Sequence, residues 1–145
     1  MTEPTEDRPT FMPIAIAAAI VVLALGSMWV LRLFRDDEVP DDGLVGRAIV
    51  AQNDALQREN YGDFRTYTCA AQQGTETQVL ADQRQSKTAK GNRFVDDVEG
   101  FTAAGDRATA TVIYHFEKSP DDKVSTPMTF VRENGVWTVC SPGPR

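Results

Sequence analysis

The chain has 145 residues, of which 41% are hydrophobic and 25% are charged, and its formal net charge is −6. After an N-terminal apolar stretch, the remainder is long enough for one domain with a small core. Lys and Arg are scattered through the chain rather than clustered. Nucleic-acid binding is therefore disfavoured, because phosphate neutralisation requires a basic face.

An uncharged apolar run extends from Phe11 to Leu31. A helix over this run rises about 30 Å, which is the thickness of the hydrocarbon core of a bilayer. The sequence therefore predicts a tail over 1–10, a single transmembrane helix over 11–34 and an acidic linker over 35–43. The alternative is a cleaved signal peptide, which needs a basic segment before the apolar run, and the segment here is acidic.

Two features disagree about the orientation of the predicted span. Arg8 precedes the run, whereas Arg32 and Arg35 follow it, so the positive-inside rule favours a cytoplasmic C-terminal domain. The cysteine pair described next favours the opposite side, because disulfides persist in oxidising compartments. We expect the N-terminus inside and the C-terminal domain outside the cell membrane.

Cys69 and Cys140 are the only cysteines, and both follow the apolar run. Their separation fits no CxxC motif, and with the single His115 they cannot make a usual structural zinc set. An even count in an extracytoplasmic domain predicts a disulfide, and closing so long a loop would contribute roughly 4 kcal/mol to stability. Two unrelated buried thiols are the alternative.

Three helices are expected in the first half of the soluble part. Apolar residues at spacings of three and four indicate a helix over 44–61, ended by Gly62 in a left-handed conformation. Asp63 then caps a short second helix. Thr75, with Gln78 three residues later, fits a capping box at the start of a third, polar helix.

After residue 92 the pattern changes to a period of two. Four strands are expected, over 93–102, 107–118, 123–133 and 136–140. In the clearest of them, Tyr114 and Phe116 point to one face and His115 points to the other. Turn-forming residues occupy 119–122. Asn134–Gly135 is typical of a type I′ hairpin turn.

Two of these strands contain irregularities. Asp96 and Asp97 interrupt the alternation of the first strand, and a bulge or bend near Gly100 would account for the lost phase. Pro127 indicates that the third strand begins irregularly or lies at an edge of the sheet.

The order of elements, helices first and then an antiparallel meander, predicts an α+β fold. We expect an N-terminal transmembrane helix followed by about three helices packed on a curved antiparallel four-stranded sheet. Cys140, at the end of the last strand, would then meet Cys69 in the helical layer and join the two layers covalently.

Two short segments carry a resemblance to a known family. The helix break Asn60-Tyr61-Gly62-Asp63-Phe64, followed by a cysteine, and the terminal hairpin Asn134-Gly135-Val136-Trp137-Thr138-Val139-Cys140 resemble the NTF2-like (cystatin-like cone) domains of actinobacterial single-pass membrane proteins. The resemblance covers about residues 44–140. It implies a cone-shaped domain whose mouth can hold a ligand, and a homodimer formed through the open face of the sheet is a further alternative.

No catalytic motif, cofactor-binding motif or metal-ligand cluster is found in the sequence. The residues considered for a ligand pocket are Tyr67, Asp96, Tyr114 and His115. Adjacent carboxylates at Asp96 and Asp97 would point to opposite faces of a regular strand, which is poor geometry for a two-carboxylate site. A single histidine on the outer face of a sheet is usually an ordinary surface residue.

We expect a non-catalytic, membrane-anchored extracytoplasmic domain that binds a protein partner or a small apolar ligand in the cell envelope, without a cofactor. Two alternatives remain. One is an NTF2-like enzyme of isomerase or hydrolase type with an acid inside the cone. The other is a structural or regulatory membrane tether.

Overall fold

The computed structural model of the chain describes residues 39–144. The predicted tail, the transmembrane helix over 11–34 and residues 35–38 of the acidic linker lie outside these residues. Among the described residues, no helix is sufficiently long and apolar to span a bilayer.

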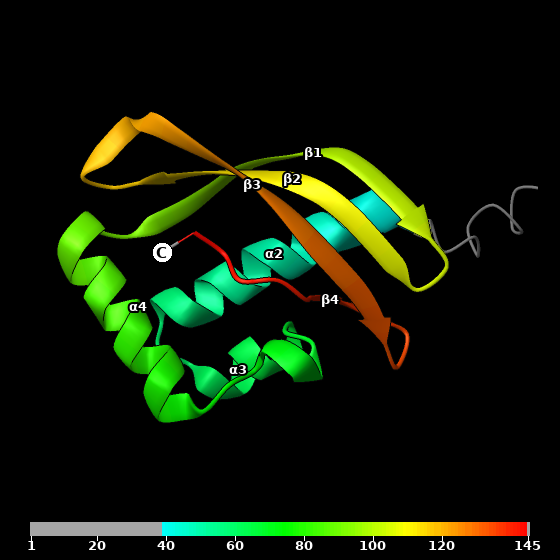
Figure 1. Cartoon of the computed structure of the whole chain (residues 1–145), viewed down its shortest axis with the longest axis horizontal. Coiled ribbons are helices and arrows are strands. Elements are labelled where there is room, and N and C mark those ends of the chain that lie inside the picture. Colours follow the sequence, from blue (N-terminus) through cyan, green and yellow to red (C-terminus); the bar gives the residue numbers. More distant parts are fainter. Residues whose placement is uncertain (1–38, 145) are drawn as a thin grey trace, which may run out of the picture. The chain divides into compact units, whose positions relative to one another are not determined.

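The described residues form three α-helices, a short 3₁₀ helix and four strands (Figure 1). The helices are α2 (Asp41–Gln57), α3 (Tyr61–Thr66), η1 (Ala70–Gln72) and α4 (Glu76–Lys90). The strands are β1 (Arg93–Ala104), β2 (Arg107–Phe116), β3 (Ser119–Glu133) and β4 (Val136–Val139). All neighbouring strands are antiparallel in the order β1-β2-β3-β4. The helices pack on one face of this curved sheet, which confirms the predicted α+β architecture.

The helix boundaries differ from the predicted ones at α2 and α3. Helix α2 begins at Asp41, so its first turn carries acidic side chains that interact favourably with the helix dipole. The left-handed residue after it is Glu59, with φ of 54°, instead of Gly62. Asn60, not Asp63, caps α3, because the Asn60 Oδ1 accepts a hydrogen bond from the Asp63 N–H at 3.0 Å.

Helix α4 begins where the sequence predicts. The Thr75 hydroxyl accepts a hydrogen bond from the Gln78 N–H at 3.4 Å. Gly91 follows the last turn with φ of +81°, and a Cβ at this position would lie 2.7 Å from the Glu117 Cβ. Glycine is therefore required there both by conformation and by space.

The last two strands turn at Asn134–Gly135, where both residues have positive φ (52° and 80°). This backbone conformation confirms the predicted type I′ hairpin. The resulting register places Arg132 opposite Trp137.

The turn between β2 and β3 lies at 117–118, and the predicted turn over 119–122 is wrong. Phe116 pairs with Ser119, so the residues of the predicted turn belong to β3. Contacts with the end of α4 explain the shift. The Glu117 N–H donates to the Asn92 carbonyl at 2.9 Å, and the Lys118 N–H donates to the Lys90 carbonyl at 3.1 Å. These tertiary hydrogen bonds outweigh the local preference of the Pro-Asp-Asp sequence for a turn.

The predicted irregularities of the sheet are present. The register of β1 shifts between Glu99 and Thr102, and Gly100 within this shift has φ of +62°. Strand β4 pairs with β3 only over 130–133, so Pro127 lies where β3 has a neighbour on one side. A proline, which lacks an N–H, is tolerated at such an edge.

The core lies between α2 and the concave face of the sheet. It consists of Val45, Ala48, Ile49, Ala108, Ala110, Val112, Tyr114, Met128, Phe130, Trp137 and Val139. The start of α2 is fixed to the sheet by Asp41, whose Oδ1 accepts hydrogen bonds from the Trp137 Nε1 at 3.0 Å and the Arg132 Nη2 at 2.6 Å. The Arg132 guanidinium also stacks on the Trp137 ring, 4.5 Å from its centroid.

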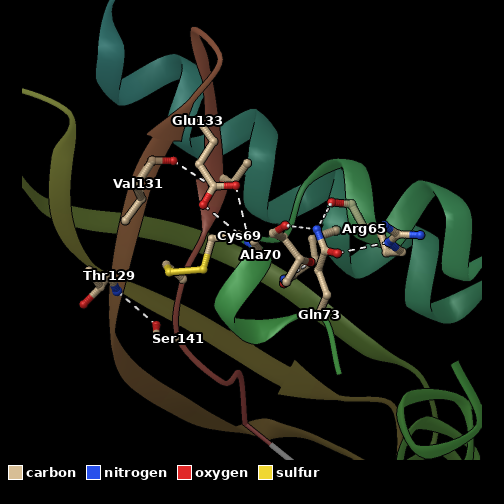
Figure 2. Close-up of a disulfide and its surroundings, with 12 residues drawn as sticks. Arg65, Cys69, Ala70, Gln73, Thr129, Val131, Glu133 and Ser141 are labelled. Atoms are coloured by element: carbon tan, nitrogen blue, oxygen red, sulfur yellow. Dashed lines mark hydrogen bonds between the residues drawn. A yellow bond between two sulfur atoms is a disulfide. The ribbon is translucent and has the colours of Figure 1, made fainter. Parts of the chain in front are cut away.

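Cys69 and Cys140 form a disulfide with a Cα–Cα distance of 5.2 Å, as predicted (Figure 2). The chain before Cys69 runs parallel to β4, because the Cys69 N–H donates to the Val139 carbonyl at 3.0 Å and the Val139 N–H donates to the Tyr67 carbonyl at 2.8 Å. The bridge therefore joins the segment that leaves α3 to the end of the last strand.

Candidate ligand pocket

A cavity of about 140 Å³ opens between the helices and the segment that follows β4. Its apolar lining comes from Leu56, Phe64, Val79 and Pro142. Its polar lining includes Gln52, Thr68, Gln72, Gln83, Ser86 and Ser141. Two charged side chains, Asp82 and Arg93, complete the polar side of the wall. The lining of the cavity thus combines apolar groups with hydrogen-bonding groups.

Helix α2 carries two polar residues on its buried face, and Gln52 is the one that lines the cavity. Gln52 and Asn53 are both buried, and each lies four residues after a core residue, Ala48 or Ile49. The Gln52 amide donates to the Thr68 hydroxyl at 2.8 Å. These amides are held in place by their partners, so the polar surface is preorganised.

Arg93, the first residue of β1, is the cation of the wall. Its Nε donates to the Asn53 Oδ1 at 2.8 Å, and its Nη1 donates to the Pro144 carbonyl at 2.6 Å. Its guanidinium carbon lies 5.5 Å from the centroid of the Tyr114 ring. Burial lowers the pKa of Arg93 below its ordinary value. Among residues 39–144, no carboxylate makes an ion pair with it.

The C-terminal segment forms one side of the cavity. It leaves the sheet at Cys140, and the Ser141 hydroxyl accepts a hydrogen bond from the Thr129 N–H at 3.0 Å. Gly143 then passes close to Arg93, where a Cβ would lie 3.4 Å from Nη1. The disulfide and these contacts position the segment against the pocket.

The acidic residue of the wall, Asp82, belongs to α4. Its Oδ1 accepts a hydrogen bond from the Gln78 side chain at 2.9 Å. Within the part of the chain that the structure describes, no cluster of three or more His, Cys, Asp or Glu residues is arranged to hold a metal ion.

The four residues that sequence analysis considered for a pocket lie outside the lining of this cavity. Tyr114 is buried in the core, where its hydroxyl donates to the Met128 sulfur at 3.0 Å and burial raises its pKa to about 12. Tyr67 contributes its backbone carbonyl to the pairing with β4.

Asp96 and His115 meet on the outer face of the sheet. The His115 Nδ1 lies 2.7 Å from the Asp96 Oδ1, and the Lys123 Nζ donates to the Asp96 Oδ2 at 2.7 Å. Hydrogen bonding from Lys123 is the main cause that lowers the pKa of Asp96. The His115 ring stacks on Phe94 with a centroid distance of 4.8 Å.

The expected opposite orientation of Asp96 and Asp97 does not occur. A register shift between Val95 and Asp97 places Asp97 opposite Ile113, on the same outer face as His115. Asp96 reaches His115 from within this bulge. Both carboxylates are therefore on the face of the sheet away from the cavity.

Sequence reasoning missed Gln52, Asn53 and Arg93, which hold the polar side of the pocket. A pattern that could have indicated two of them is the interruption of the apolar stripe of α2. Gln52 and Asn53 occupy positions that continue from Ala48 and Ile49, where a packed helix would carry apolar residues. Buried amides on such a face need partners, and this requirement predicts a polar site beneath the helix.

Comparison with solved structures places this arrangement of elements in a known fold. A candidate NTF2-like transpeptidase from Campylobacter jejuni superposes with a TM-score of 0.50 at 17% identity, over 67% of this chain and 97% of that chain. The fold is NTF2-like. The pocket is lined by residues of α2 to α4, by the first residue of the NTF2-like sheet, and by the segment that follows β4.

Other NTF2-like structures resemble the chain at lower similarity. A candidate dehydratase of the NTF2-like family from Streptomyces avermitilis matches with a TM-score of 0.46 at 18% identity, covering 68% of this chain and 90% of that chain. An NTF2-like protein of unknown function from Shewanella oneidensis matches with a TM-score of 0.42 at 10% identity, covering 66% of this chain and 91% of that chain. No protein-family model and no curated protein matches the sequence.

Proposed function

We propose that this chain is a non-catalytic binding protein of the cell envelope, whose NTF2-like domain holds a small organic ligand in the cavity between its helices and its C-terminal segment. The observation that carries this proposal is the amphipathic wall of the cavity. Apolar side chains such as Leu56, Phe64 and Val79 are available for the body of a ligand, and fixed polar groups are available for its head.

The cavity volume limits the size of the ligand. At about 140 Å³ it is close to a cavity of about 150 Å³ that accommodates benzene. A single ring or a chain of about six carbons, with a polar head, therefore fits the space. The ligand proposed here is amphipathic, which differs from the purely apolar ligand expected from the sequence.

The placement of reactive groups supports a binding role over an enzymatic one. Histidine is the usual base for a serine nucleophile, and the single His115 lies on the outer face of the sheet, away from Ser86 and Ser141 in the cavity. Both cysteines are bonded to each other. The pocket acid Asp82 accepts a hydrogen bond from the Gln78 side chain.

The disulfide supports an extracytoplasmic location, because such bonds persist in oxidising compartments. Alkylation of intact membranes, before and after reduction, tests this. Both thiols should be blocked until a reductant is added. Two thiols that react without reduction would place the domain in the cytoplasm and refute this part of the proposal.

The binding proposal is tested by a fragment screen on the ¹⁵N-labelled full-length chain. Fragments of six to nine heavy atoms should shift the side-chain amide resonances of Gln52 and Gln83, which line the cavity. Ser86→Phe fills the cavity and should abolish these shifts. Thr88→Phe, an exposed position on the same helix outside the lining, is the matched control and should leave them unchanged. If no fragment shifts the cavity resonances, the proposal is refuted.

A further inference from the structure

Arg93 has an unusual charge environment for a residue in a cavity wall. Charged groups removed from water are normally paired with an opposite charge, yet its protein partners are the neutral Asn53 amide, the Pro144 carbonyl and the Tyr114 ring. Burial lowers the pKa of Arg93, which reflects the same lack of compensation. The positive charge is present, partly desolvated and without an anion among the described residues.

Part of the guanidinium is free to bind another group. A guanidinium has five N–H donors, and the two hydrogen bonds to protein use the Nε–H and one N–H of Nη1. The second N–H of Nη1 and both N–H groups of Nη2 remain without a partner among residues 39–144. Two adjacent nitrogens with free donors match the two oxygens of a carboxylate.

We propose that Arg93 recognises the carboxylate of a small monocarboxylic acid whose apolar body lies against Leu56, Phe64 and Val79. This inference rests on the proposed function and names the class of its ligand. Asn53 acts as a positioning residue, because its Oδ1 binds the Arg93 Nε and its Nδ2 donates to the Arg93 carbonyl at 3.0 Å.

The other charged group of the wall is compatible with this assignment. The carboxylate of Asp82 would repel an acid, but its Oδ1 is bonded to the Gln78 side chain within α4. Asp82 has a further interaction besides this hydrogen bond. The carboxylate of the ligand therefore belongs at the β1 side of the cavity and its apolar body at the helical side.

The test compares acids with neutral amides of the same shape. Benzoate and benzamide, and hexanoate and hexanamide, are titrated into the full-length chain at pH 7 while the Gln52 and Gln83 amides and the Arg93 Nε–H are followed by NMR. The acids should bind about tenfold or more tightly than the amides, because hydrogen bonds between charged groups are stronger than neutral ones. The Arg93 Nε–H resonance should shift with the acids alone.

Two variants separate charge from shape. Arg93→Met should bring acid and amide affinities to the same value. Arg93→Lys should keep a preference for acids, but the ratio of acid to amide affinity should be smaller than in the unmodified chain. The comparison in the unmodified chain stands even if a variant does not fold. Equal affinities of acids and amides would overturn the assignment of a carboxylate and leave the binding proposal intact. No binding of either series, together with a negative fragment screen, would overturn both.

Discussion

Trp137 offers a direct test of how the helical layer is held on the sheet. Its side chain is 3% exposed and belongs to the core, whereas the adjacent Val136 is 50% exposed. Truncating a buried tryptophan to alanine costs about 3–5 kcal/mol through lost burial and the cavity that remains. For a domain of this size each kcal/mol corresponds to roughly 4–8 °C in Tm, so Trp137→Ala should lower Tm by about 12–40 °C.

The assay is urea unfolding of the full-length chain followed by far-UV circular dichroism, which does not depend on tryptophan fluorescence. Val136→Ala, one residue away on the same strand, is the control and should cost less than about 1 kcal/mol. A loss below about 1 kcal/mol for Trp137→Ala, or equal losses at the two positions, would contradict the packing described.

The hydrogen bond from Trp137 can be measured separately. Trp137→Phe removes the Nε1 donor to Asp41 but keeps an aromatic ring. Hydrogen bonds to a charged group contribute roughly 1.5–3 kcal/mol, so Trp137→Phe and Asp41→Ala should be coupled by about 1 kcal/mol or more in a double-mutant cycle. Strict additivity of the two substitutions would refute the bond.

Three further results are expected. Reducing the Cys69–Cys140 bridge should destabilise the domain by roughly 4 kcal/mol on the chain-entropy model, and an unchanged thermal melt in reductant would refute this. Gly91→Ala should cost about 2 kcal/mol or more, measured by urea unfolding, because φ is +81° and the new Cβ would overlap Glu117; Gly105→Ala, where φ is also positive but no atom is near, should cost less. Burial raises the pKa of Tyr114 to about 12 from an ordinary value near 10. The contribution of the neutral Tyr114 side chain to folding stability is therefore complete below pH 10 and is lost as the pH rises towards 12. A tyrosinate absorbance titration should show one late step that is absent in Tyr114→Phe.

The parts of the fold that follow from local chemistry were predictable. The Asn134–Gly135 turn and the start of α4 depend on residues within a few positions of each other. The disulfide was also predictable, because only two cysteines were available. The turn between β2 and β3 was not, because its position is decided by hydrogen bonds that the turn's backbone N–H groups donate to the carbonyls of Asn92 and Lys90.

The pocket was harder to predict than the fold. Arg93 is an ordinary residue at the start of a strand when only its neighbours are considered. Its environment comes from Asn53, forty positions earlier, and Pro144, fifty-one positions later. Such a site depends on how three distant segments meet, and only the polar residues on the buried face of α2 pointed towards it.

The disulfide also determines how the domain transmits mechanical load. Cys69 and Cys140 are 71 positions apart and enclose α4 and all four strands in a covalent ring. A pull on the two ends of the chain passes through α2 and α3 to Cys69 and then across the bridge to Cys140. The bridge prevents the chain between the two cysteines, about 240 Å long when fully extended, from being pulled straight. With the bridge intact, the sheet therefore carries no continuous tension even when the helices that precede it are stretched open.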